Sequence, residues 1–350
     1  MSRSSAQRKH DLTADACQKA LVKLIQSFSH GHHLHSVFSD FVELCALAIS
    51  NSVDRTQFEV REKRYLDIVG KYKREEVERF PEMLGLLTES LELRVQAMGK
   101  AGASGSAMVS GGLTDVLGET YMMLELGNAR AGQFFTPYHV SRLMAMMTIG
   151  DGGAAVRETG FMRLQEPACG AGGMVIAAAE SLHDAGLNYQ QAMHATCIDI
   201  DPCCVHMAYV QLSLLHIPAI VVHGNALTLD VWGLWYTPAH IMGGWRRKLE
   251  RRERKALAEI LAIAGEQAAE SSGEEVAVEV SLSEPQPEAD AGADGETAVL
   301  DRPVVIDVGT AKDVMPLSES LALHDLFEEI VSSEKPSNSI FEKIDQMSLF

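Results

Sequence analysis

The stretch Glu166-Pro167-Ala168-Cys169-Gly170-Ala171-Gly172-Gly173 decides the fold of this chain. It follows an apolar run that begins at Phe161, and it opens a run of small and apolar residues from Met174 to Ala179. This order predicts a strand, a glycine turn and a helix. Glycines let the backbone approach a ligand closely, and the first turn of a helix offers unpaired N–H groups to it. The stretch therefore predicts a binding site at the end of a strand.

A second strand is predicted over 195–200, and carboxylates follow its apolar core at Asp199 and Asp201. Dinucleotide-binding folds place a carboxylate at this strand end to hold a ribose. A simpler interpretation is that the two carboxylates cap the helix that comes next. Two further blocks flank these segments. Upstream lies Gly132-Gln133-Phe134-Phe135-Thr136-Pro137, and downstream lies Gly224-Asn225-Ala226-Leu227.

The four blocks, at 132–137, 166–173, 199–202 and 224–227, resemble in their order the motifs of the N6-adenine DNA methyltransferases. The closest resemblance is to the modification subunit of type I restriction-modification systems, and it spans roughly residues 113 to 227. It implies an α/β fold with a Rossmann-like class I methyltransferase sheet. It also implies S-adenosylmethionine as cofactor and DNA as substrate.

The resemblance assigns roles in cofactor binding residue by residue. Phe135, Thr136 and Pro137 would lie at the methionine end, and Glu166 would accept hydrogen bonds from the methionine ammonium. The glycine turn, with Ala168, Gly170 and Gly172, would bring its backbone close to the cofactor. Asp199 would hold the ribose hydroxyls, and Ile200 and Asn225 would contact the adenine.

One departure concerns the transfer step. The family's tetrapeptide, Asn/Asp/Ser-Pro-Pro-aromatic, should follow the fourth block, and no Pro-Pro pair occurs in the sequence. The nearest substitutes are Trp235, Tyr236 and Pro238, which could stack a base while Thr237 or backbone carbonyls accept its protons. Alternatively, the aromatic residues merely cover the edge of the sheet. The sequence thus supports a cofactor site more strongly than it supports turnover.

Three segments follow from pattern and composition. A helical N-terminal domain is predicted over 12–131, with a glycine- and serine-rich loop at 99–112. The methyltransferase domain is predicted over 132–264, with strands near 161–165, 195–200 and 218–223 and a short fourth strand near 240–242. A complete methyltransferase sheet has about seven strands, so this sheet is expected to be incomplete. A charged helix is predicted from 246.

The net charge of −18 belongs to a tail. Residues 265–350 hold 20 acidic and 4 basic residues, whereas the rest of the chain holds 28 and 26. The tail composition predicts disorder, and the nearly neutral body does not exclude nucleic acid as a partner. The run 246–255 has seven basic and two acidic residues, which suits either a phosphate backbone or a solvated helix with mixed-charge pairs.

The last residues resemble the bacterial sliding-clamp-binding peptide, in which a glutamine and two large apolar side chains enter a groove. Gln346, Leu349 and Phe350 would make those contacts, and a frayed terminus is the alternative. A separate specificity subunit is a further possible partner.

Other classes of protein fit poorly. No apolar h-region or run of about eighteen apolar residues is seen, and six cysteines without C-x-x-C spacing favour a reducing cytoplasm. The histidines at 30, 32, 33 and 35 lack further ligands at metal-site spacing, so no metal is expected.

Three functions remain open. The first is a DNA adenine-N6 methyltransferase dependent on S-adenosylmethionine. The second is a catalytically silent binding protein that keeps the cofactor fold and acts at DNA through the clamp. The third is a methyltransferase acting on another substrate, which the block at 132–137 makes less favoured.

Overall fold

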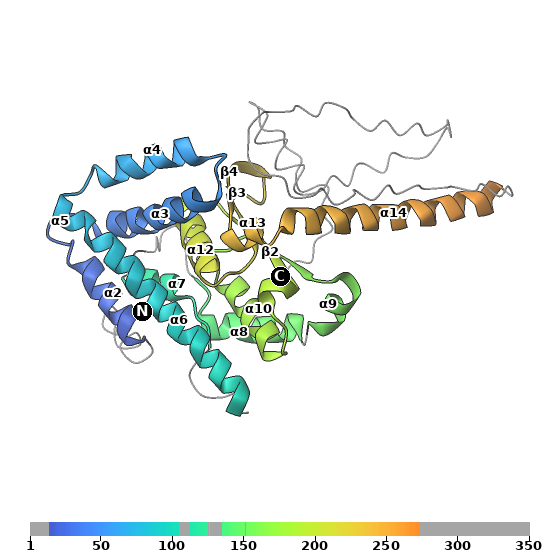
Figure 1. Ribbon diagram of the computed structural model, residues 1–350, viewed down its shortest axis with the longest axis horizontal. Helices are drawn as coiled ribbons and strands as arrows, with labels where there is room; N and C mark the ends of the chain where they lie inside the picture. The colour runs from blue at the N-terminus through green and yellow to red at the C-terminus, as the bar shows by residue number, and fades with distance from the viewer. Residues whose placement is uncertain (1–13, 105–111, 125, 127–134, 151, 273–350) are drawn as a thin grey trace, which may run out of the picture. The chain divides into compact units, whose positions relative to one another are not determined.

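The computed structural model describes residues 14–104, 112–124, 126, 135–150 and 152–272, and the side chains of 99–104 and 265–272 are not described. The described chain is a mixed α/β fold, with helices first and a four-stranded sheet after them (Figure 1). The boundary between its two compact units falls within the last helix, after Arg252.

Helices fill the N-terminal part, as the sequence predicts. The side chain of Asp15 caps the first of them by accepting a hydrogen bond from the Gln18 backbone N–H at 2.7 Å. By length and composition the second could cross a membrane, but its apolar face is buried inside the protein. The helices are α2 (Ala16–Gln26), α3 (Leu34–Val53), α4 (Phe58–Val69), α5 (Arg74–Val77), α6 (Arg79–Ser104) and α7 (Val116–Met123).

Helix α6 runs further than predicted. It extends through 99–104, part of the predicted loop, because alanines among the glycines keep helix propensity high. Pro81 stands in its first turn, where a missing N–H leaves no bond unmade.

The sheet has the strand order β1-β2-β3-β4. The first three strands are parallel and are joined by helices that pack on the sheet, and all three predicted strands are confirmed within two residues. Their bounds are β1 (Met162–Glu166), β2 (Met193–Asp199) and β3 (Ala219–Asn225). The helices around them are α8 (Tyr138–Ile149), α9 (Gly153–Thr159), α10 (Gly173–Asp184), α11 (Tyr189–Ala192) and α12 (Pro202–Leu214).

The fourth strand is not where the sequence analysis put it. Strand β4 (Asp230–Tyr236) returns antiparallel to β3 after a tight turn, and residues 240–242 belong to the short helix α13 (Pro238–Met242). The prediction near 240–242 was wrong because Thr237 caps this helix and Pro238 opens it, a start signal that outweighs a three-residue apolar run. Leu229, with a φ of +68°, makes the turn before β4.

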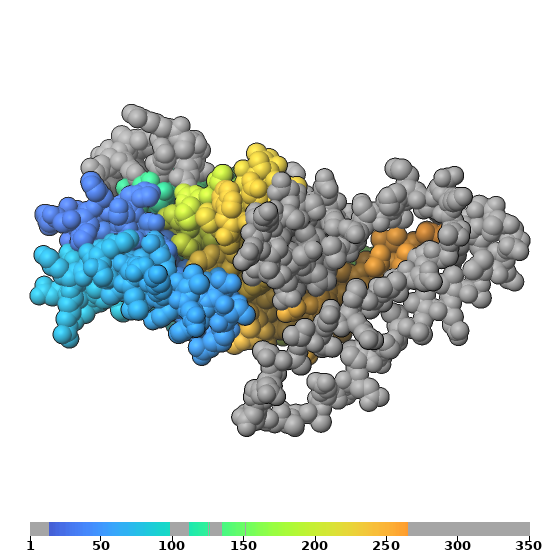
Figure 2. Space-filling model, turned by 90° about the horizontal axis from the view of Figure 1, so that it is seen from above, coloured from blue at the N-terminus to red at the C-terminus, as the bar shows by residue number. Residues whose placement is uncertain are grey.

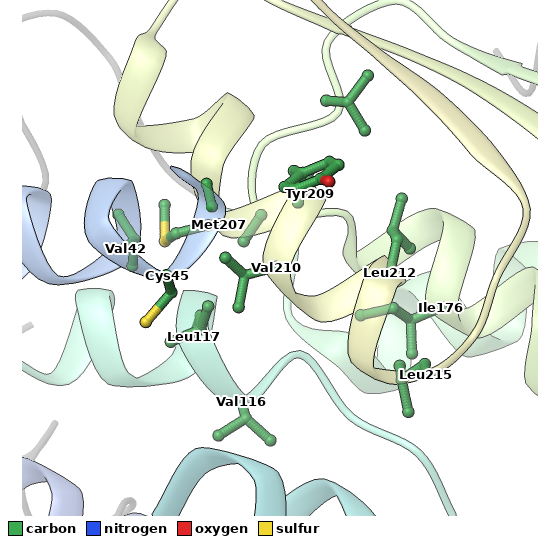
Figure 3. Packing of buried hydrophobic residues seen from close by; sticks show 14 of the residues in the cluster. Val42, Cys45, Val116, Leu117, Ile176, Met207, Tyr209, Val210, Leu212 and Leu215 are labelled. Carbon is green, nitrogen blue, oxygen red and sulfur yellow. The ribbon is translucent and has the colours of Figure 1, made fainter. Parts of the chain in front are cut away.

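Helix α12 is the centre of the core. Its residues pack on one side against Val42 and Cys45 of α3 and on another against Ile176 of α10 (Figure 3). Val116 and Leu117 of α7 close the same cluster. One continuous core therefore joins the N-terminal helices to the sheet, and in Figure 2 the two regions lie directly against each other.

The last helix, α14 (Trp245–Ser272), confirms the predicted charged helix and continues past residue 265. At its start the Trp245 ring packs edge-on against Phe161 with centroids 4.9 Å apart. Two of its basic residues pair with acids one turn on, Arg246 with Glu250 at 3.1 Å and Lys255 with Glu259 at 3.7 Å.

Candidate functional site at the carboxyl ends of the parallel strands

Each parallel strand ends in a polar residue. Glu166, Asp199 and Asn225 are the last residues of β1, β2 and β3, which lie side by side in that order. Glu166 aligns with Cys197 and Asp199 aligns with His223, so the strand ends form one edge of the sheet. In open parallel sheets ligands bind outside this edge.

The glycine turn adopts the backbone that only glycine takes easily. Gly170 has a φ of +53° and Gly172 a φ of +90°, both in the left-handed region. The turn is fixed to β2, because the Cys169 N–H donates to the Ile198 carbonyl at 2.9 Å. Helix α10 then begins at Gly173, so the turn connects the end of β1 directly to a helix N-terminus.

The carboxylate of Asp199 connects the turn to the second strand. Its Oδ2 accepts from the Gly170 N–H at 2.8 Å, and its Oδ1 accepts from the Asp201 N–H at 2.9 Å. Burial raises the pKa of Asp199 and the backbone N–H groups partly offset this. Asp201 has the simpler role foreseen for both residues, since it caps α12 by accepting from the Cys203 N–H at 2.8 Å.

Glu166 is the least satisfied polar group of the site. Its side chain is 1% exposed. One oxygen accepts a long 3.4 Å bond from the Ala168 N–H, and the other, Oε2, has no hydrogen-bond partner in the described structure. Burial, with a smaller contribution from the nearby charge of Asp199, raises the pKa of Glu166 to about 7. A buried carboxylate with a free oxygen fits a cationic ligand group.

Residues 135–137, the described part of the block at 132–137, lie beside the glycine turn. The ring of Phe135 lies against the turn, so that a Cβ added at Gly170 would meet it at 3.0 Å. The Phe135 ring also packs on Tyr121, with centroids 5.4 Å apart. Thr136 is exposed and Pro137 precedes α8, while Gly132, Gln133 and Phe134 lie outside the described residues.

The remaining predicted residues lie around the same edge. Ala168 is exposed in the turn, and Ile200 is 59% exposed beside Asp199, which leaves a large apolar surface facing outward. Asn225 closes the turn to β4, since its Oδ1 accepts from the Leu227 N–H at 2.9 Å. Gly172 packs against Ala208 of α12, and a Cβ added at Gly172 would lie 3.5 Å from the Cα of Ala208.

Two buried residues that the sequence analysis missed, Gln211 and Asp115, form hydrogen bonds that support the glycine turn. The Gln211 amide donates to the Ala171 carbonyl at 2.8 Å and to Asp115 Oδ1 at 2.7 Å, and its oxygen accepts from the Leu117 N–H at 3.0 Å. Burial raises the pKa of Asp115 to about 6. The turn is therefore tied to α7 of the N-terminal part. A glutamine within an apolar helix is the one sequence signal that pointed there.

The proposed substitutes for the missing tetrapeptide lie elsewhere. Because β4 is antiparallel, Tyr236 pairs with Ile220 near the beginning of β3, away from Asn225. Trp235 is buried, with the Arg61 guanidinium 4.2 Å from its ring centroid. Pro238 opens α13 beyond that end. Through Cys197 and Val221 the register places Trp235 level with Glu166, but β1 and β4 are the two outer strands of the sheet, so the structure does not bring these three residues beside Glu166.

Thr237 is also committed to the fold. Its hydroxyl donates to the Ile217 carbonyl at 2.9 Å and accepts from the Ala219 N–H at 2.9 Å, and its side chain is fully buried. The aromatic residue of this region that is open to solvent is Trp232, 53% exposed, with its ring 5.0 Å from that of His223.

The segment that builds this site is similar to a known protein family. Residues 113–242 match the family model of N-6 DNA methylases. The match begins beside Asp115 and covers the glycine turn, all three strand ends and β4. No curated protein matches the chain. Gln346, Leu349 and Phe350 of the clamp-binding hypothesis lie outside the described residues.

No metal site is seen where the structure describes the chain, which includes His30, His32, His33 and His35. His32 instead contacts Glu76, with Nε2 3.2 Å from Oε1.

Proposed function

We propose that the chain binds S-adenosylmethionine at the carboxyl ends of β1, β2 and β3 and acts as a DNA adenine-N6 methyltransferase-like protein. The observation that carries the proposal is Glu166, a buried carboxylate with one oxygen unpartnered in the described structure and a second carboxylate close by. S-adenosylmethionine bears an ammonium and a sulfonium, so it brings positive charge to a site that two carboxylates make negative.

The strand order supports one direction for the proposed cofactor. Glu166 on β1 would accept from the methionine ammonium, and Asp199 on β2 would take the ribose hydroxyls with the lone pairs left beside its two backbone bonds. Ile200 would cover the adenine, and Asn225 on β3 would meet its edge. Phe135 and Thr136 would flank the methionine end, where Phe135 already lies against the turn.

Methyl transfer makes demands that this arrangement only partly meets. When bound, the cofactor supplies an electrophilic methyl group. The protein must hold an adenine that has left the duplex and accept hydrogen bonds from its amino group. In this direction the methyl would lie toward β1, whereas β4 lies beyond β3, where the adenine end would be. Trp235, Tyr236 and Pro238 are therefore poorly placed to hold the acceptor base.

That placement, together with the missing tetrapeptide, favours a second candidate. The chain would bind the cofactor without turnover and act at DNA as a binding protein. Recruitment would come through the sliding clamp, which Gln346, Leu349 and Phe350 would contact. A type I modification role with a separate specificity subunit belongs to the first candidate, the methyltransferase, and a cytoplasmic location is proposed for both candidates.

Isothermal titration calorimetry tests the site itself. The full chain should bind S-adenosylmethionine, and Asp199→Asn should weaken binding about tenfold or more, since bonds to charged groups contribute roughly 1.5–3 kcal/mol. Asparagine can still accept one of the two backbone bonds, so it disturbs the turn less than alanine. Wild-type protein that releases no heat with the cofactor, or an Asp199→Asn variant with unchanged affinity, would contradict the proposal.

A labelled-methyl assay separates the two candidates. The chain is incubated with labelled cofactor and adenine-containing DNA, which is then digested to nucleosides. N6-methyladenine that is lost in Asp199→Asn identifies an enzyme. Binding in calorimetry with no labelled product on DNA, RNA or protein identifies the silent protein. Deletion of 346–350 tests recruitment separately, because it should abolish capture by purified sliding clamp and leave cofactor affinity unchanged.

A further inference from the structure

The middle of α14 exposes more apolar surface than a solitary helix in water carries. Eight of the nine residues from Ala256 to Ala264 are alanine, leucine or isoleucine, Glu259 being the exception. The four large side chains are between 40% and 56% exposed. They are Leu257, Ile260, Leu261 and Ile263. A helix segment that is apolar on most sides is normally buried against a partner.

The same helix changes sign along its length. Residues 246–255 hold seven basic and two acidic residues, whereas 265–272 hold two acidic residues and no basic ones. The apolar cluster lies between these halves, close to the midpoint of Trp245–Ser272. A partner that fits must therefore present acid, then apolar surface, then base along its length.

A second copy of α14 running in the opposite direction has that order. A two-fold axis near residues 258 and 259 would set Leu257 opposite Ile260 of the other copy and the basic half of each helix opposite the acidic half of the other. Such a contact uses the same patch twice and closes on itself. A parallel pair would instead place like charges together along both halves.

We propose that residues 257–263 of α14 are a self-association surface, through which two copies of this chain pair as antiparallel helices. The helix is long enough for such a seam, at about 1.5 Å per residue over 28 residues. The positions 257, 260, 261 and 264 follow the three-and-four spacing that helix pairs use. This inference does not depend on the cofactor site.

Sedimentation equilibrium of the full chain over a concentration series tests the association. The wild type should be a dimer, and Ile260→Glu with Leu261→Glu should weaken dimerisation by about 100-fold or more, since each lost 1.4 kcal/mol is tenfold. Leu66→Glu is the matched control, because Leu66 of α4 is 59% exposed and lies elsewhere. Circular dichroism checks that the variants stay folded. A wild type that is monomeric throughout, or a double variant that dimerises as well as the control, overturns the proposal.

Disulfide cross-linking tests the orientation. The six native cysteines are all buried, so an introduced one is the reactive thiol. Residues 253 and 264 continue the three-and-four spacing of the seam, and the two-fold axis would set them opposite each other. Glu253→Cys alone should not cross-link, but a mixture of Glu253→Cys and Ala264→Cys should form mixed dimers. Self-cross-linking of Glu253→Cys without mixed dimers would show a parallel pair and overturn the antiparallel one.

Discussion

The backbone N–H of Gly170 lies 2.8 Å from Oδ2 of Asp199, and this hydrogen bond makes the glycine turn and the end of β2 a single unit. The carboxylate thus holds the shape of the turn before any ligand arrives. A substitution at either residue should change both the turn and the proposed cofactor site.

Gly170→Ala should abolish cofactor binding and lower stability. Alanine is strained at a φ of +53°, and its Cβ would meet the Phe135 ring at 3.0 Å. Gly150→Ala is the matched control, because Gly150 has a φ of +57° with open space around it. Urea unfolding should show a small loss for the control and a larger loss for Gly170→Ala. Equal losses together with equal cofactor affinities would show that the contact with Phe135 is unimportant.

Glu166→Gln should stabilise the ligand-free chain at pH 8. The pKa of Glu166 is about 7 when folded and 4.5 when unfolded, so the folded chain binds more protons between these values and loses stability as pH rises through them. The loss is of order 1–3 kcal/mol, which a neutral amide avoids. Urea unfolding at pH 4 and pH 8 checks this. If the difference in free energy of unfolding between the wild type and Glu166→Gln is the same at pH 4 and at pH 8, the pKa of Glu166 is not raised.

Cofactor affinity should rise with pH through the same range. In the proposed binding mode the methionine ammonium would bind the ionised form of Glu166, and burial raises the pKa of the unliganded carboxyl to about 7. Binding below pH 7 therefore releases a proton, and affinity should rise by up to about tenfold per pH unit until Glu166 is ionised. Calorimetry in buffers of different ionisation enthalpy measures that proton. Glu166→Gln should bind weakly with a flat profile, and a flat wild-type profile would place the ammonium elsewhere.

Gln211→Leu should loosen the turn from α7. Leucine leaves the Ala171 carbonyl and the Leu117 N–H without the partners they have now, and each unmade buried bond costs about 1–3 kcal/mol. We expect a loss of about 2–5 kcal/mol in urea unfolding, together with weaker cofactor binding. Gln191→Leu, at an exposed position, is the control and should change neither quantity. Normal cofactor affinity in folded Gln211→Leu would show that the turn keeps its shape unaided.

Trp235→Ala should destabilise the protein by about 3–5 kcal/mol and leave cofactor affinity unchanged. The Trp235 ring contacts His206 and Tyr209 of α12 and lies under the Arg61 guanidinium, on the outer strand of the sheet opposite β1. Trp232→Ala, at an exposed position, should cost much less. A Trp235→Phe variant that folds and binds the cofactor but loses methyl transfer would restore the catalytic role considered for this tryptophan.

The fold was predictable where one segment carries its own signal. Apolar runs ending in Glu166 and Asp199 predicted their strands, and parallel pairing brings such ends to one edge. Strand β4 was not predicted because Gly233 and the charged first residue, Asp230, obscure the alternation of apolar and polar residues that marks a strand. The antiparallel pairing of β4 with β3 depends on the topology of the whole sheet, which no single segment of sequence encodes.

Long-range contacts were beyond sequence reasoning for a different reason. Asp115 and Gln211 meet across 96 residues, and neither belongs to a recognisable motif. Arg61 reaches Leu234 across 173 residues, and its partner there is a backbone carbonyl, which has no signature in sequence. Such contacts depend on how α4, α7 and α12 pack, and packing is decided by the whole core.

The Arg61 contact has a practical consequence. Its Nη2 donates to the Leu234 carbonyl at 2.6 Å, so a helix near the start of the chain shields part of the outermost strand of the sheet. A recombinant fragment limited to residues 113–242 would lose that guanidinium and expose Trp235 on an unprotected edge strand. Such a fragment would aggregate rather than fold, and expression work on this protein should begin upstream of α2.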